Sequence, residues 1–270
     1  MLGFEIEKNT AAAILSEREL LNNISAERIR EELTKLLCGD NAAAVLREYA
    51  GVIAVVLPEL APMFGFEQHN EHHCHDVWEH TLAAVDSVVD QPVLRWAALL
   101  HDAGKPHTFT LGEDGVGHFY GHAPRSAGIA ENIMKRLRFD NESRERIVTL
   151  IRHHDGPLEA DAKFLKRKLN KLGERGFFDL IALCRADNMA QAAAYRYRQQ
   201  HYDEIERIAR EILAGDSCFT LKDLAVNGHD LMALGYKGRE IGNALDMLLE
   251  AVIDERVENE KSALLKLIGK

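Results

Sequence analysis

Histidine and aspartate side chains recur at five separate points of this sequence, in an order that could assemble a metal site. The five points are His80, the pair His101-Asp102, His122, the pair His153-His154, and Asp187. Imidazole nitrogens and carboxylate oxygens in this mixture suit Mn, Fe, Co, Ni, Zn or Mg rather than a thiolate-only site. A single histidine is usually a surface or satisfied core residue, so the prediction depends on all five points converging.

Two aspartates are expected to point toward the inside of the protein. Asp187 shares a helical stripe with Leu180 and Cys184, and Asp102 lies in the last turn of an apolar helix predicted over residues 93–103. A buried carboxylate is strongly destabilising unless it is paired, hydrogen-bonded or bound to a cation. A divalent ion would provide that compensation.

The remaining histidines lie near helix ends. Pro124 is predicted at the first helical position, which places His122 just before a helix N-terminus, where anions are stabilised. The next helix, over 141–154, carries His154 on its apolar face. His153 is rotated away by about 100° and is expected near the site rather than as a ligand.

The apolar periodicity is helical along the whole chain, so the predicted fold class is all-α. The best strand candidate is Gly115 to Tyr120, within a connection from Pro106 to Gly121 that is long enough to shape the rim of a pocket. Further helices are predicted over 9–21, 25–37 with Ser25 as N-cap, 42–56 and 76–89. We expect an N-terminal helical segment (1–65), a central helical bundle with the metal site (66–214) and a C-terminal helical tail (215–270).

The bulk composition restricts partners and location. The 270 residues include 33 Lys plus Arg against 43 Asp plus Glu, a formal charge of -10, so any nucleic-acid contact is expected to be a local patch. The four cysteines are too widely spaced for a zinc finger or a disulfide framework, which favours a reducing cytoplasm. No apolar run of about 18 residues and no export signal are present, so no membrane partner is expected.

The local context of the metal-type residues resembles the HD superfamily of metal-dependent phosphohydrolases. Its pattern H…HD…D is matched by His80 within Val77–Leu82, His101-Asp102 within Leu99–Pro106, and Asp187. The resemblance implies a helical HD domain over 66–214 in which His80, His101, Asp102 and Asp187 ligate one ion. It also implies that His122 and His154 hold a second.

Hydrolysis of a phosphate ester is the activity that this resemblance implies. One or two divalent ions would lower the pKa of bound water and neutralise phosphoryl charge, with Asp102 and Lys105 as catalytic residues. Substrate phosphate would be contacted by Lys105, Arg125, His153 and His73. The other polar residues of the loop 68–76 are assigned to solvent, and a second metal cluster there is the less favoured interpretation. The expected substrate is a nucleotide, a 2′,3′-cyclic phosphate or an RNA-terminal phosphate.

A closer resemblance covers nearly the whole chain, from about Leu2 to about Leu267. Ile24–Leu33 is similar to the helical neck of bacterial CCA-adding tRNA nucleotidyltransferases and poly(A) polymerases, and Val226–Tyr236 with Ile241-Gly242 is similar to their tail. The Gly-Ser and Asp-x-Asp motifs of their polymerase head occur nowhere in this sequence. Nucleotide addition by this chain alone is therefore not expected, since two-metal transfer needs those carboxylates.

Basic and aromatic residues give the RNA hypothesis separate support. The residues are Lys163, Lys166, Arg167, Lys168, Lys171, Arg175, Tyr195-Arg196-Tyr197-Arg198 and Tyr202. Such residues can hold phosphate and stack bases, although a solvated helix face is an equal alternative. The favoured function is a metal-dependent phosphohydrolase. The alternatives are a tRNA-binding body whose polymerase head is supplied elsewhere, and a metal-stabilised interaction module without turnover.

Overall fold

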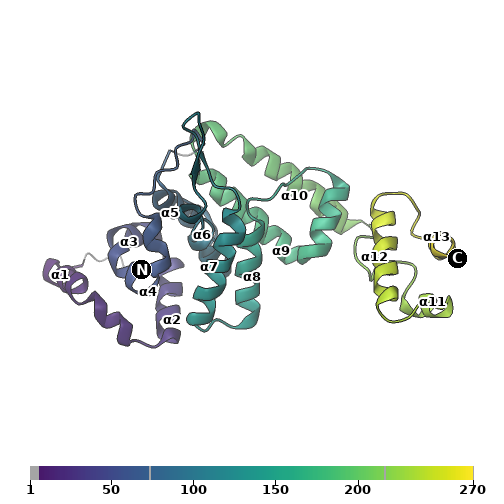
Figure 1. The fold of residues 1–270 in the computed structure, drawn as a ribbon, viewed down its shortest axis with the longest axis horizontal. Coiled ribbons are helices and arrows are strands. Elements are labelled where there is room, and N and C mark those ends of the chain that lie inside the picture. The colour runs from purple at the N-terminus through teal and green to yellow at the C-terminus, as the bar shows by residue number, and fades with distance from the viewer. Residues whose placement is uncertain (1–5, 73, 216, 270) are drawn as a thin grey trace. The chain divides into compact units, whose positions relative to one another are not determined.

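The computed structural model describes residues 6–72, 74–215 and 217–269, and helices account for most of them (Figure 1). The prediction of an all-α fold is confirmed. In chain order the elements are α1 (Lys8–Ser16), η1 (Arg18–Asn23), α2 (Ala26–Leu37), α3 (Ala42–Glu48), α4 (Ala50–Val56), η2 (Pro58–Met63), α5 (Val77–Ser87), α6 (Pro92–Leu100), η3 (Lys105–His107), β1 (Thr110–Leu111), β2 (Gly117–His118), α7 (His122–Arg136), α8 (Asn141–His153), α9 (Ala162–Ala190), η4 (Ala193–Tyr195), α10 (Arg198–Ala214), α11 (Gly228–Ala233), α12 (Arg239–Ile253) and α13 (Lys261–Ile268).

The chain divides into two compact units. The first comprises the described residues up to Gly156 together with Asp179–Gln199. The second comprises Pro157–Phe178 and the described residues from Gln200 onward. Helix α9 passes from one unit to the other and is kinked at Gly173, whose φ of 68° lies in the left-handed region. The predicted division into segments 1–65, 66–214 and 215–270 stays a prediction.

Helix α6 is the centre of the first unit. All seven residues from Leu94 to Leu100 are buried, so the helix is covered on every side. The indole of Trp96 donates a hydrogen bond to the Thr34 hydroxyl of α2 (2.9 Å). Because α6 is fixed in this way, the two residues that follow it, His101 and Asp102, are carried into the protein interior.

Several predicted helix starts are confirmed, and one is wrong by two residues. The side chains of Ser25, Asp76 and Asp140 cap α2, α5 and α8 by accepting backbone N–H groups. Helix α7 begins at His122 itself, after Gly121 in the left-handed region (φ 77°), and Pro124 is its third residue. Proline is tolerated there because the first N–H groups of a helix have no helical partner.

The long helices predicted near the N-terminus are shorter than expected. The helix predicted over 42–56 is two helices that meet at Tyr49, and the one predicted over 9–21 ends at Ser16 before the 3₁₀ turn η1. The strand predicted over 115–120 is reduced to β2, which pairs antiparallel with β1. Apolar periodicity continues across each of these breaks, so it could not reveal them.

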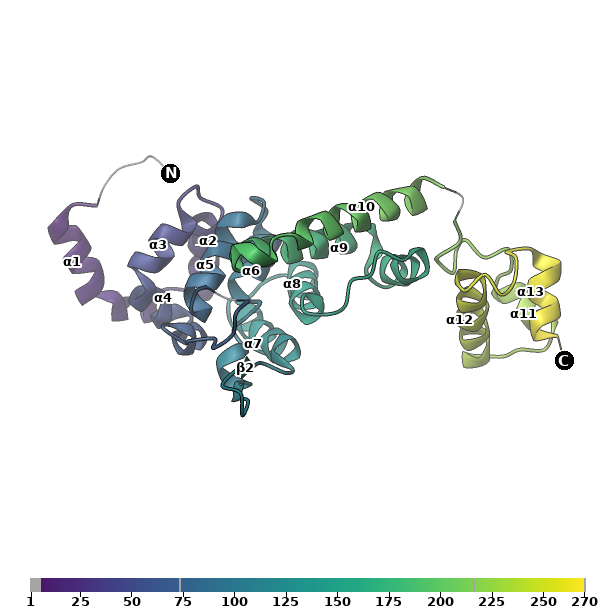
Figure 2. The ribbon, with the colours of Figure 1, turned by 90° about the horizontal axis from the view of Figure 1, so that it is seen from above.

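The C-terminal part of the second unit has a small core of its own. Helices α11, α12 and α13 lie together in both views (Figures 1 and 2) and bury Leu231, Leu248 and Leu264 completely. The Tyr236 hydroxyl, between α11 and α12, donates a hydrogen bond to the Ile268 carbonyl of α13 (3.0 Å). Among the helices that the structure describes, none combines the length and the apolar character needed to cross a membrane.

Replacing Leu37 with alanine tests the packing of the first unit. Leu37 is fully buried at the end of α2, so we expect Leu37→Ala to lower the free energy of unfolding by about 2 to 5 kcal/mol. Both tryptophans of the chain, Trp78 and Trp96, lie in this unit, so their fluorescence in urea follows its unfolding. Leu20→Ala, at a side chain that is 57% exposed, should change the free energy of unfolding by less than about 0.5 kcal/mol. Equal losses would contradict the assigned core.

Candidate functional site

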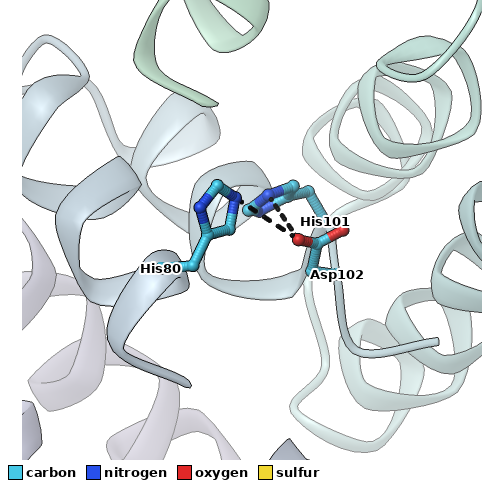
Figure 3. Close-up of side chains that lie close together, drawn as sticks. All are labelled: His80, His101 and Asp102. Carbon is cyan, nitrogen blue, oxygen red and sulfur yellow. Dashed lines mark ion pairs between the residues drawn. The ribbon is translucent and has the colours of Figure 1, made fainter. Parts of the chain in front are cut away.

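The first unit brings the metal-type side chains together from five helices. His80 comes from α5, His101 and Asp102 follow α6, His122 begins α7, and His154 and Asp187 come from the end of α8 and from α9; all but Asp187 are buried. In Figure 3 the ring nitrogens of His80 and His101 face one oxygen of Asp102. Asp102 Oδ2 lies 3.5 Å from His80 Nε2 and 3.2 Å from His101 Nε2.

Asp102 stands between two groups of possible ligands. The first group is His80, His101 and Asp102, and the second is Asp102, His122 and His154; within each, the ligand atoms lie within 4.8 Å of one another. Oδ1 faces the second group, 3.4 Å from His122 Nε2 and 3.8 Å from His154 Nε2. A single carboxylate can therefore serve two adjacent cation positions.

Asp187 completes the first group. Its Oδ1 accepts a hydrogen bond from His80 Nε2 (2.8 Å) and lies 3.7 Å from His101 Nε2. The side chain is 22% exposed, which leaves it accessible from the cavity. The six residues predicted as ligands are thus brought together, and their role in holding a metal stays a prediction.

The histidine rings are oriented by backbone carbonyl groups of their own segments. In three of them Nδ1 donates to the carbonyl three residues earlier: His101 to Ala98 (2.7 Å), His122 to Phe119 (2.9 Å) and His154 to Ile151 (2.7 Å). A carbonyl oxygen can only accept, so Nδ1 carries the proton and Nε2 is the nitrogen turned toward Asp102. Metal-binding histidines show this arrangement, in which the outer nitrogen is held by a hydrogen bond.

The cluster contains charged groups in a buried environment, and this shifts their pKa values. Burial disfavours ionisation of Asp102 and Asp187, but positive and hydrogen-bonding neighbours, His101 foremost among them, hold both pKa values well below the usual range. Burial also disfavours charge on His101, yet Asp102 outweighs it and raises the pKa of His101 to about 10. Burial lowers the pKa of His122. Both carboxylates thus depend on positive charge beside them.

The donor set fits a divalent cation. Asp102 Oδ1 and the Nε2 of His101 are buried without a hydrogen bond in the described residues, whereas Asp102 Oδ2 is paired with the Lys105 ammonium. Buried polar atoms without a partner are rare, because each loses its hydration without compensation. Coordination by a cation would satisfy Asp102 Oδ1 and His101 Nε2, and a mixture of imidazole nitrogen and carboxylate oxygen suits the divalent transition metals.

Lys105 was predicted at the phosphate and lies in the interior beside Asp102. Lys105 is only 5% exposed, and its ammonium lies 2.7 Å from Asp102 Oδ2. It donates a hydrogen bond to Gln68 Oε1 (2.8 Å) and lies over the Phe119 ring. Gln68 was assigned to solvent, which is wrong: it is 2% exposed and helps to hold Lys105. No periodicity in its irregular loop pointed to this role.

The other predicted phosphate contacts are not brought into the cluster. Arg125 is exposed on α7 and His153 is half-buried at the end of α8, and neither lines the cavity beside Asp102. His73 lies outside the described residues. Among the described residues, neither group of possible metal ligands includes a side chain of the loop 68–76. The substrate contacts of Arg125, His153 and His73 stay predictions.

A cavity of about 300 Å³ opens onto the cluster. Its walls include Asp102, Lys105, His122, His154 and Asp187. Residues 117–121, which join β2 to α7, form another part of its lining. This confirms the prediction that the connection between Pro106 and Gly121 shapes the rim of a pocket.

Gly104 fixes the approach of the Asp102 segment to α7. A Cβ atom at this position would lie 2.5 Å from the His122 carbonyl oxygen and 2.7 Å from the Ser126 amide nitrogen. We therefore expect Gly104→Ala to destabilise the first unit by about 1 to 3 kcal/mol, measured by urea unfolding with tryptophan fluorescence. Gly128→Ala in α7 is the matched control, because a Cβ atom added at this position would meet no described atom within 4 Å outside the backbone of its own helix. It should stabilise by about 0.4 to 1 kcal/mol. Equal effects of the two changes would refute the close approach.

Two family models match the sequence. One, described as "Probable RNA and SrmB-binding site of polymerase A", matches residues 3–64. The other describes tRNA nucleotidyltransferase domain 2 and matches residues 125–268, more than half of the chain. The two matches lie on either side of residues 65–124.

Curated relatives are similar along most of the chain. The CC-adding tRNA nucleotidyltransferase of Thermus thermophilus is 34% identical over 97% of the chain and 62% of that protein. The A-adding tRNA nucleotidyltransferase of Deinococcus radiodurans is 30% identical over 93% of the chain and 61% of that protein. The multifunctional CCA protein of Azoarcus is 35% identical over half of the chain. The chain therefore spans about three-fifths of the first two relatives.

These relatives correct the predicted reaction class. The sequence was expected to encode a metal-dependent phosphohydrolase, whereas the relatives are nucleotidyltransferases, which are transferases. The predicted hydrolase is therefore wrong, and the matching family models describe an RNA-binding segment and a nucleotidyltransferase domain. The closer of the two resemblances noted in the sequence, to the body of tRNA nucleotidyltransferases, is the one that is confirmed.

Proposed function

The chain belongs to the tRNA nucleotidyltransferase domain 2 family, and from this we propose that it is an RNA-binding body that holds tRNA for nucleotide addition. The observation that carries the proposal is the similarity to a CC-adding enzyme over 97% of the chain. The Gly-Ser and Asp-x-Asp motifs expected of a catalytic head are absent from this sequence. The transfer chemistry is accordingly assigned to residues outside it.

Only some of the basic residues of α9 are available for RNA. Lys163 pairs with Glu255 (3.0 Å) and donates to the Asp254 carbonyl, and Arg167 pairs with Glu250 (2.8 Å) and with Asp254. These contacts lie within the second unit, and the predicted place of both residues in a basic patch for RNA stays a prediction. Their charges are largely neutralised by the acidic partners.

Lys171 and Arg175 are two further cations of this helix. Both are exposed, and neither has an ion pair within the part of the chain that the structure describes. They lie on either side of the kink at Gly173. Cations of this kind bind phosphate and release counterions, so their contribution is measurable as a salt dependence.

Reversing both charges tests RNA binding by this surface. We expect the double variant Lys171→Glu/Arg175→Glu to weaken tRNA binding and to reduce the slope of log affinity against log salt by about 2, between about 50 and 200 mM. Fluorescence anisotropy with labelled tRNA gives both quantities.

The matched control is Arg207→Glu/Arg210→Glu on α10 in the same unit. Arg207 is paired with Glu204 and Glu211, and Arg210 with Glu206 (3.5 Å), so these cations are already occupied. The control makes the same change in net charge and should leave the slope unchanged. An equal loss in both variants would show that net charge, rather than this surface, governs binding.

We further propose that the cluster around Asp102 is a divalent metal centre. Support comes from the orientation of the histidine Nε2 atoms and from the buried Asp102 Oδ1, which has no hydrogen bond in the described residues. His80, His101, Asp102 and Asp187 would hold one ion, and Asp102, His122 and His154 a second. When bound, such a cation neutralises the carboxylates and attracts anionic oxygen atoms of a ligand. Lys105 keeps one Asp102 oxygen in place.

Asp102→Asn tests this metal centre. The change keeps the shape of the side chain but removes its charge, so we expect Mn²⁺ to bind wild-type protein and to raise its unfolding temperature, with both effects lost in the variant. Mn²⁺ retained after desalting is measured by mass spectrometry. Asp155→Asn is the control, because Asp155 lines the same cavity but is 62% exposed. Equal Mn²⁺ binding by wild type and Asp102→Asn would refute the centre, with circular dichroism to confirm folding.

A further inference from the structure

Two aromatic rings stand side by side at the edge of the cavity. The rings of His118 and Tyr120 are stacked, with centroids 5.3 Å apart and an interplanar angle of 10°. Both residues line the cavity beside Asp102. Phe119, between them in the chain, turns the other way and contacts the Phe109 ring and the Lys105 ammonium. This alternation places His118 and Tyr120 on one side of the segment.

Tyr120 is unusually open for a large aromatic residue. It is 80% exposed, and no hydrogen bond to its hydroxyl occurs within the described residues. One face of its ring lies against His118, so the opposite face is open to solvent. Exposed aromatic faces at the edge of a cavity are suited to stacking on a planar heteroaromatic ring, and nucleobases are the common ligands of this shape.

The stacked pair is tied directly to the metal-type cluster. A single residue, Gly121, separates Tyr120 from His122, and two residues of chain span at most about 7 Å. Gly121 has a φ of 77°, so the chain turns sharply between the open ring and the buried histidine. A ligand that stacks on Tyr120 therefore lies next to the cavity that contains Asp102.

The charges of the cavity define the rest of the ligand. Asp102, Asp155 and Asp187 line it together with Lys105, so an anion is repelled unless a divalent cation is present. With a cation bound, a phosphate group is attracted to the same place. A planar ring joined to a phosphate is a nucleotide.

We propose that His118 and Tyr120 form a base-stacking platform for one nucleotide, whose phosphate binds at the metal centre. The inference rests on the proposed metal centre. The nucleotide is either free or the unpaired end of an RNA strand, since both present the same base and phosphate. The platform contributes binding, and no reaction is assigned to it.

Calorimetric titration with adenosine 5′-monophosphate and with ribose 5-phosphate, at saturating Mn²⁺, tests the platform. Wild-type protein should bind the nucleotide more tightly than the sugar phosphate. Tyr120→Ala should weaken nucleotide binding by about ten-fold, because the base stacks on Tyr120. The affinity for ribose 5-phosphate, which has no base, should not change. Tyr120→Phe should keep wild-type affinity. Leu111→Ala is the control, since Leu111 is 59% exposed and lies outside the cavity lining.

A short single-stranded RNA in place of the mononucleotide separates the two sources of ligand. If Tyr120→Ala weakens the binding of the RNA but not of the mononucleotide, the ligand is a strand end. If it weakens the binding of the mononucleotide, the ligand is a free nucleotide. If Tyr120→Ala alters the binding of neither, the proposal is overturned. Mn²⁺ binding is measured separately in every variant. If wild-type protein does not bind Mn²⁺, the proposed metal centre is refuted. If Mn²⁺ binds normally and Tyr120→Ala has no effect on ligand binding, only the platform is refuted.

Discussion

The first unit is organised around the buried carboxylate of Asp102. The side chain is 1% exposed, and its low pKa keeps it charged in an environment that disfavours charge. Its stability there depends on positive or polar groups supplied from other helices: the ammonium of Lys105 and the rings of four histidines. The helices that provide these groups must therefore meet at the end of α6.

Local backbone geometry then determines which atoms face the carboxylate. Helix α6 is buried on all sides, so its C-terminal end has a fixed position, and the Nδ1–H of His101 is bonded to the last turn of that helix. His122 and His154 are held in the same way by carbonyl groups three residues earlier. Orientation is thus local, within each segment, whereas convergence is a property of the fold. The proposed metal centre depends on both the orientation and the convergence.

The convergent residues could be predicted because helical periodicity shows which face of a helix is inside. This was sufficient to place His154 inward rather than His153, and to place Asp187 beside the apolar stripe of α9. Contacts between segments distant in sequence leave no such signal. Gln68 holds Lys105 from an irregular loop, and Arg167 pairs with Glu250 and Asp254 more than eighty residues away. The break at Tyr49 was also missed, since both helices continue one apolar pattern.

The residues of the site were not sufficient to predict the reaction class. Histidine and aspartate ligands hold a cation, and a cation serves binding, structure or several kinds of phosphate chemistry. Six side chains therefore define a type of site without defining a reaction. Similarity over 97% of the chain to a CC-adding nucleotidyltransferase constrains far more of the surface than the site alone does. The proposed metal centre and the proposed base-stacking platform beside it describe the binding of a nucleotide, and they require no hydrolysis.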